Sequence, residues 1–133
     1  MELHQGRLFD HVHLRVRDLE ASKRFYSAAV EALGLGLSRE SEHAFAADEL
    51  YVTADGEPTV GLHIAFQARD RGDVHRFYDA ALAAGGRDNG APGERGYHPG
   101  YYAAYVLDPD GNNVEAVFHG PAQRSAPSVV VRV

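Results

Sequence analysis

Apolar and polar residues alternate in two short segments of the chain. In residues 12–16 every second residue is apolar, and residues 64–68 show the same pattern. A period of two is typical of a strand with one buried face, so both segments predict β-strands. After each strand, apolar residues recur at helical spacing behind an aspartate, Asp18 or Asp70, that can cap a helix. The two predicted helices end at Gly34 and at Gly85–Gly86.

The two strand-helix segments are copies of one another. His11 and His63 lie 52 residues apart, and the following residues match at this offset without a gap. The shared positions in the first copy are Arg17, Asp18, Arg24, Phe25, Tyr26, Ala28, Ala29, Ala32 and Gly34. Shorter strand candidates follow each helix, so each half predicts β-α-β-β-β. We expect an α+β fold in a single domain, residues 1–133, with one module at about 8–55 and the other at about 60–119.

The second half also predicts how the chain turns. Tyr101–Leu107 and Asn113–His119 form a candidate hairpin around the tight turn of residues 108–111. Residues 86–100 hold five glycines and two prolines, which predicts a mobile loop that could serve as a lid. The tail, residues 120–133, is consistent with an added edge strand or with a disordered end.

Packing both helices on the outer face of a curved, mixed sheet would leave a cup lined by the polar sides of the strands. His11, His63 and Glu115 are each the inward residue of their strand. Two imidazoles and a carboxylate suit Fe, Mn, Ni, Co or Zn with open positions left over, so they predict a divalent metal site. Taken singly, a strand histidine is more often structural, and an inward glutamate is more often paired with an arginine such as Arg15.

Other residues are candidates for chemistry in the same cup. His13 shares the face of His11 and is a candidate general base, although a rim histidine fits equally well; Tyr51 mirrors Glu115 in the first module or merely fills the cup. The substrate-contact candidates, some of which could equally be exposed loop residues, are Arg95, His98, Tyr102 and Asn113.

Composition narrows the function classes. The 133 residues include no cysteine, which excludes disulfides, thiolate zinc sites and a cysteine nucleophile. A formal charge of −6 disfavours nucleic acid as a partner. The first residues lack a basic stretch followed by an apolar one, and no apolar run could span a bilayer. We therefore expect a cytoplasmic protein that does not bind membranes.

Two segments resemble a known family: Asp-His-Val-His-Leu-Arg-Val-Arg-Asp from Asp10, and Leu-Asp-Pro-Asp-Gly-Asn-Asn-Val-Glu-Ala-Val from Leu107. The chain resembles the vicinal oxygen chelate superfamily, which includes glyoxalase I, fosfomycin-modifying transferases, extradiol dioxygenases and bleomycin-resistance proteins. The resemblance implies paired β-α-β-β-β modules around a divalent metal, with His11, His63 and Glu115 as its ligands.

The resemblance also bears on activity. Glyoxalase I has a second carboxylate late in the first module, where this chain offers Tyr51, with Glu49 two residues away. The complete ligand set favours an enzyme that chelates adjacent oxygens of a small substrate and stabilises an oxyanion or enolate. The alternatives are a non-catalytic binding protein of the bleomycin-resistance type and a structural dimerisation module with a relict site. Family members commonly dimerise so that two subunits build each site, so we expect a homodimer.

Overall fold

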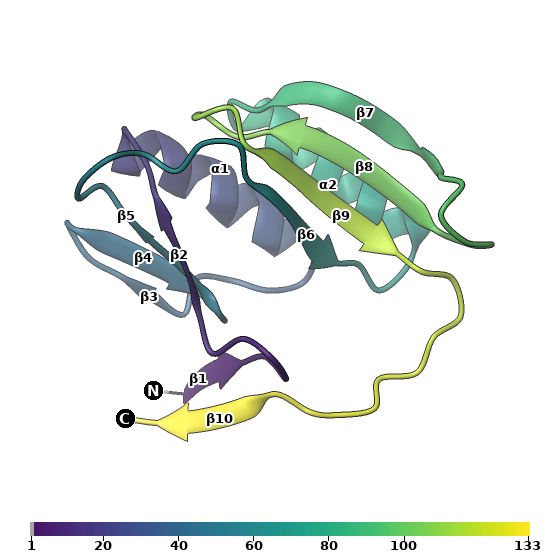
Figure 1. Ribbon diagram of the computed structural model, residues 1–133, viewed down its shortest axis with the longest axis horizontal. Helices are drawn as coiled ribbons and strands as arrows, with labels where there is room; N and C mark the ends of the chain where they lie inside the picture. Colours follow the sequence, from purple (N-terminus) through teal and green to yellow (C-terminus); the bar gives the residue numbers. More distant parts are fainter. Residues whose placement is uncertain (1) are drawn as a thin grey trace.

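Two β-α-β-β-β modules follow one another along the chain, as the computed structural model of residues 2–133 shows (Figure 1). The elements of the first module are β2 (Val12–Arg15), α1 (Leu19–Ala32), β3 (Arg39–Glu40), β4 (Ala44–Ala47) and β5 (Leu50–Thr53). Those of the second are β6 (His63–Gln67), α2 (Arg71–Ala83), β7 (Arg87–Glu94), β8 (Tyr102–Leu107) and β9 (Asn113–Phe118). The predicted fold class is confirmed.

Each module forms its own four-stranded mixed sheet. The strand orders are β2-β5-β4-β3 and β6-β9-β8-β7, and in both sheets the first strand pairs in parallel with the last. Both helices begin at the predicted caps, because Asp18 accepts a hydrogen bond from the Ala21 backbone N–H and Asp70 from that of Asp73. The two caps lie at the 52-residue offset of the repeat, so the copies are equivalent in structure as well as in sequence.

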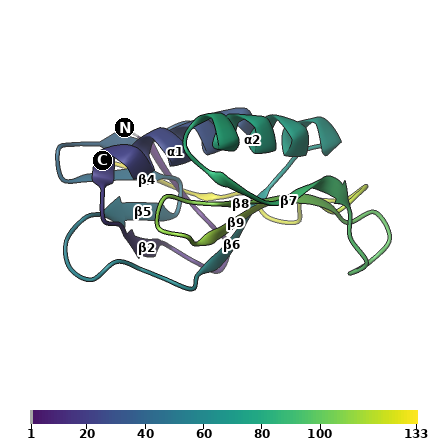
Figure 2. The same ribbon diagram turned by 90° about the horizontal axis from the view of Figure 1, so that it is seen from above.

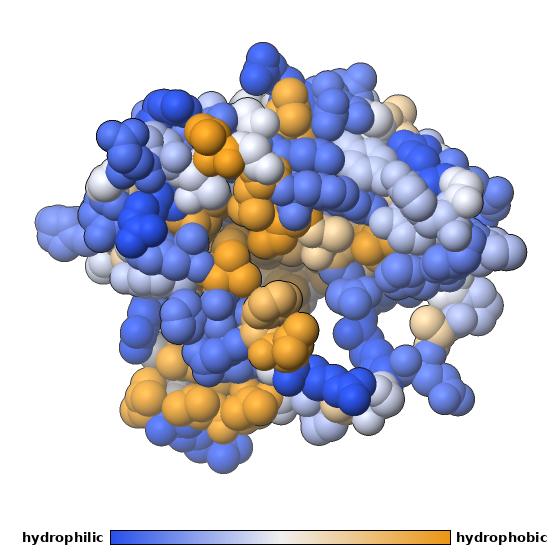
Figure 3. All heavy atoms as spheres, in the orientation of Figure 1, coloured by the Kyte–Doolittle hydropathy of each residue, from blue (hydrophilic) through white to orange (hydrophobic). Residues whose placement is uncertain are grey.

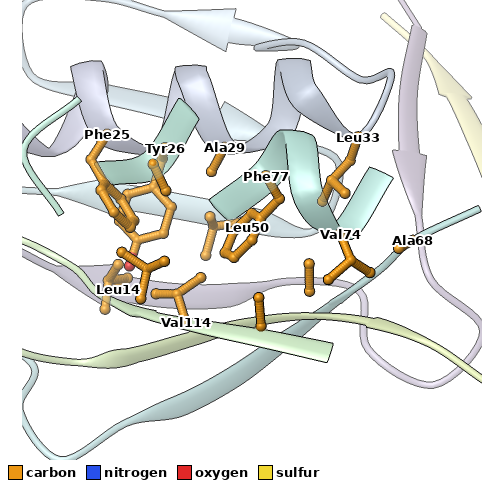
Figure 4. Packing of buried hydrophobic residues seen from close by; sticks show 14 of the residues in the cluster. Leu14, Phe25, Tyr26, Ala29, Leu33, Leu50, Ala68, Val74, Phe77 and Val114 are labelled. Carbon is orange, nitrogen blue, oxygen red and sulfur yellow. The ribbon is translucent and has the colours of Figure 1, made fainter. Parts of the chain in front are cut away.

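Both helices lie on the same side of the sheets (Figure 2). The core between helices and sheets includes Phe25, Tyr26 and Phe77 from the helices, and none of the three is exposed to solvent (Figure 4). The apolar faces of the strands close this core, with Leu14 from β2 and Val114 from β9. No helix within residues 2–133 is long and apolar enough to span a membrane.

The predicted turn between β8 and β9 also joins the two modules. The Tyr26 hydroxyl, on α1, donates a 2.6 Å hydrogen bond to the buried Asp108 carboxylate. Burial and this carboxylate raise the pKa of Tyr26 well above its usual value, so the phenol remains a donor. Arg17, two residues after the end of β2, forms a 2.9 Å ion pair with Asp110 in the same turn. The acidic turn therefore has a structural role across the module boundary.

The prediction of a mobile loop over residues 86–100 is wrong for most of its length. Residues 87–94 form β7, which pairs with β8 through two register shifts. Gly90 is needed for close packing, because a Cβ there would lie 2.8 Å from the Tyr105 ring. Only the segment between β7 and β8 remains a loop.

The chain ends form a separate ribbon. β1 (Glu2–Gln5) pairs with β10 (Val129–Arg132) in an antiparallel two-stranded sheet below the first module in Figure 1. The tail thus contains a strand, but it joins neither four-stranded sheet. Apolar side chains gather on the surface at β10 (Figure 3), where Val129, Val130 and Val131 are all at least 39% exposed.

Candidate functional site

The predicted ligands His63 and Glu115 come from neighbouring parallel strands. Residues 64 and 66 of β6 pack against the core, so His63 lies on the opposite, open face of the sheet. On β9, Val114 and Ala116 are fully buried in the core, which turns Glu115 to that same face. Ala65 is the register partner of Glu115. His63 lies two residues before Ala65 on β6 and therefore on the same face, which places it beside the Glu115 carboxylate.

His63 and Glu115 form a direct pair. Nε2 of His63 lies 2.7 Å from Oε1 of Glu115, and the Tyr101 hydroxyl donates to the other carboxylate oxygen. The Glu115 side chain is only 2% exposed, whereas that of His63 is 55% exposed. A buried carboxylate is costly unless it is paired, and here both oxygens have partners. The structure therefore holds this carboxylate in place beside an accessible imidazole.

Tyrosines line the pair on the β8 side. Tyr105 is the register partner of Glu115, and its ring centroid lies 6.1 Å from that of His63. Burial, followed by the nearby Glu115 carboxylate, raises the pKa of both Tyr101 and Tyr105. Both phenols are therefore neutral near pH 7, and Tyr101 is the one that donates a hydrogen bond to Glu115.

A second aromatic group lies towards the loop between β7 and β8. Nε2 of His98 is 3.0 Å from Nδ1 of His119, and the two rings stack with centroids 5.2 Å apart. The Tyr101 ring contacts both imidazoles, which joins this group to the Glu115 pair. The Arg95 guanidinium lies 5.3 Å from the centre of the Tyr105 ring. His98 and Arg95 thus lie near the predicted metal ligands.

His11, the third predicted ligand, lies apart from the other two within the described chain. It precedes β2, and its Nδ1 lies 2.8 Å from the carboxylate of its neighbour Asp10, with the imidazole 62% exposed. Within residues 2–133, no three His, Asp or Glu side chains are grouped so that they could hold a metal ion. The set of His11, His63 and Glu115 is therefore not assembled inside a single chain.

The first module has its own polar cluster at the matching place. His13 and Tyr51 are register partners on β2 and β5, with ring centroids 4.8 Å apart. Nε2 of His13 lies 2.7 Å from the Thr53 hydroxyl, which donates in turn to Asp55. Glu49 lies before β5, and burial followed by the Asp48 charge raises its pKa. His13 and Tyr51 are thus brought together on neighbouring strands.

The two remaining substrate-contact candidates lie in different settings. Asn113 is the register partner of His63 and accepts a hydrogen bond from the Asn89 amide, so it lies next to the His63–Glu115 pair. Tyr102 is buried on the helix side of β8, where it hydrogen-bonds to His75 and stacks under Arg71. Tyr102 therefore faces away from Glu115.

Sequence reasoning missed Tyr101, Tyr105, Thr53 and Asp55. The alternation along β8 contains a signal for the two tyrosines. Ala104 and Val106 are buried in the core, so Tyr105, and Tyr101 just before the strand, fall on the opposite side with Glu115. No local pattern identifies Thr53 or Asp55, whose importance depends on a histidine about 40 residues away.

Comparison with known proteins agrees with this architecture. The family model described as Glyoxalase/Bleomycin resistance protein/Dioxygenase superfamily matches residues 8–116. The chain belongs to this superfamily. Among curated proteins, no significant match was found.

Solved structures of the Glyoxalase/Bleomycin resistance protein/Dioxygenase superfamily share the fold. A glyoxalase/bleomycin resistance protein from Albidiferax ferrireducens T118 is 32% identical with a TM-score of 0.72, and the match covers 83% of this chain and 98% of that one. A glyoxalase-related enzyme from Fulvimarina pelagi is 21% identical with a TM-score of 0.69, over 96% and 99% of the two chains. Lactoylglutathione lyase from Agrobacterium tumefaciens is 21% identical with a TM-score of 0.60, over 84% and 93%. The last two likenesses show the fold alone.

Proposed function

We propose that the protein is a metal-dependent enzyme that acts on a small oxygenated substrate, with its site completed by a second copy of the chain. The observation that carries the proposal is the His63–Glu115 pair, in which an imidazole nitrogen and a carboxylate oxygen lie 2.7 Å apart on the open face of the sheet. These two donor types fit a divalent transition ion, which would take the place of the hydrogen between them.

A second subunit supplies the missing ligand in this proposal. His11 is exposed and lies apart from the other two ligands within its own chain, so the His11 of a partner is free to reach them. Most oligomers are symmetric dimers, in which each chain would give His11 to one site and His63 with Glu115 to the other. The exposed face of the β1–β10 ribbon is consistent with contacts to a partner, because an isolated two-stranded sheet is only marginally stable in water.

The residues around the ligands have separate roles. Tyr101 donates to one oxygen of Glu115, so the other oxygen would be the one to hold the ion. A bound divalent ion would act as a Lewis acid towards adjacent substrate oxygens. Arg95, His98 and Asn113 are the candidate substrate contacts, and His13 or Tyr51 would accept or donate the proton. Adjacent oxygens on a small molecule define the proposed substrate class, and the reaction belongs to the lyase, transferase or dioxygenase type.

Metal analysis after dialysis tests the proposal. We expect about one Fe, Mn, Ni, Co or Zn ion per chain in the wild type, and loss of the ion in His63→Ala and Glu115→Gln. His43→Ala is the matched control, because His43 is an exposed histidine in the first module. If folded wild-type protein binds none of these metals, the enzyme proposal is wrong, and a binding protein of the bleomycin-resistance type becomes the better account.

A further inference from the structure

The polar cluster of the first module contains a directed chain of hydrogen bonds. His13 contacts the Thr53 hydroxyl at 2.7 Å, and that hydroxyl donates to Oδ1 of Asp55. Leu14 on β2 and Val52 on β5 are buried in the core, so His13 and Thr53 both lie on the opposite, open face. Thr53 itself is only 6% exposed, which shields the middle of the chain from water.

The direction of these bonds follows from the chemistry of the last member. The Thr53 hydroxyl is the main cause of the lowered pKa of Asp55, and Arg15 adds to it with its Nε 3.6 Å from the same carboxylate oxygen. Asp55 is therefore ionised at neutral pH and can only accept. Thr53 has one hydroxyl hydrogen and donates it to Asp55. In its contact with His13, Thr53 must therefore be the acceptor.

A neutral His13 that donates through Nε2 has no hydrogen on Nδ1. Its two ring nitrogens are then distinct, and the lone pair of Nδ1 is available to another group. The hydrogen bonds formed within residues 2–133 include none to His13 Nδ1, whereas Tyr51 lies against the ring at a centroid distance of 4.8 Å.

The internal repeat shows the same strand pairing without this cluster in the second module. In the second module the register equivalents of His13 and Thr53 are Ala65 and Val117, both apolar. The same strand pairing therefore forms without a histidine or a hydroxyl at these places. The polar pair is therefore specific to the first module.

We propose that Thr53 and Asp55 are positioning residues that hold His13 with its hydrogen on Nε2, so that Nδ1 is the hydrogen-bond acceptor for the substrate on the open face of the first module. This inference rests on the proposed function, because it places a substrate at this face. In the proposed dimer, each chain gives its His11 to the metal site of its partner. His13 lies two residues from His11, so its Nδ1 would lie beside that metal site.

The tautomer of His13 can be measured without metal or substrate. Long-range ¹H–¹⁵N correlation spectra of the metal-free, ¹⁵N-labelled protein at slightly alkaline pH should show His13 as a single species with its hydrogen on Nε2. Thr53→Val should move the two ring ¹⁵N resonances towards each other, as in a mixture of tautomers, and Thr53→Ser should retain the wild-type spectrum. His63 is the internal control, and its resonances should not change.

Asp55→Asn provides an independent test, because Asp55 is 73% exposed and its replacement does not disturb the core. An asparagine amide can donate to the Thr53 oxygen, which leaves the Thr53 hydroxyl able to donate to His13. This variant should therefore also give a mixture of His13 tautomers. A wild-type His13 with its hydrogen on Nδ1, or unchanged spectra in both Thr53→Val and Asp55→Asn, would overturn the inference. Because no metal is present, this result is independent of whether the metal proposal succeeds.

Discussion

Tyr51 and Glu115 occupy the same place in the two modules. Tyr51 is the register partner of His13 on β2, and Glu115 is the register partner of Ala65 on β6, which lies 52 residues after His13. Both side chains lie on the open face of the last strand of their module. The first module therefore offers a phenol where the second offers a carboxylate, so the chain lacks the second carboxylate that its resemblance to glyoxalase I would call for.

Tyr51→Glu should supply that carboxylate. If the open faces of two chains meet at one metal ion, a second carboxylate adds a negatively charged oxygen ligand. We expect metal affinity to rise by about tenfold or more, which is ~1.4 kcal/mol. Titration calorimetry with Ni²⁺ or Zn²⁺ measures the change. Tyr51→Gln has the same shape without the charge and should not reproduce it; equal affinities in the two variants would place Tyr51 away from the ion.

Tyr26→Phe should destabilise the contact between the modules. The buried Tyr26 hydroxyl donates to the buried Asp108 carboxylate. The variant removes this donor, so Asp108 stays buried with one hydrogen bond fewer. We expect the free energy of unfolding to fall by about 1–3 kcal/mol, because a buried group that loses its partner keeps its desolvation penalty. Urea denaturation measures the loss. Tyr97→Phe is the control, because Tyr97 is 73% exposed, and an equal effect in both variants would rule out a specific role for the buried bond.

Acid should weaken the start of α2 through Asp73. This buried carboxylate accepts hydrogen bonds from Arg69 Nε at 2.8 Å and from Arg76 Nη2 at 2.6 Å. These bonds hold the pKa of Asp73 well below its usual range, and the bond from Arg69 has the largest effect. Because the pKa of Asp73 is lower in the folded than in the unfolded state, the ionised carboxylate stabilises the fold. This contribution is complete above pH ~3.9, the pKa of an unfolded aspartate, and is lost progressively as the pH falls below that value.

Asp73→Asn should therefore cost about 3 kcal/mol of unfolding free energy at pH 7 and clearly less at pH 2.5. Denaturation at the two pH values measures the difference between the variant and the wild type. The exposed Asp79→Asn is the control on the same helix and should change little at either pH. A cost that is the same at both pH values would show that the ion pairs do not stabilise the fold.

The sequence predicts the modules well because their signals are local. The strand period and the caps Asp18 and Asp70 fix the elements, and the alternation on β6 and β9 correctly places His63 and Glu115 on one face. Local rules do not reveal the strand at residues 87–94, because glycine is typical of loops and the need for Gly90 arises from the Tyr105 ring on the neighbouring strand. The phase of β8 places Tyr102 on the helix side and Tyr105 opposite Glu115, and this phase depends on which side of the strand faces α2. The contact from His13 to Thr53 spans 40 residues and required the folded sheet.

The central claim is that two chains together build each metal site. It is tested by the metal content of a heterodimer in which one chain is His11→Ala and the other is Glu115→Gln, co-expressed with two different tags and purified through both. In the proposed arrangement the heterodimer keeps one complete site, from His11 of one chain and His63 with Glu115 of the other. We predict about one bound ion per heterodimer, about two per wild-type dimer and none in either homodimeric variant. A heterodimer without metal, beside a metal-loaded wild type, would contradict the account.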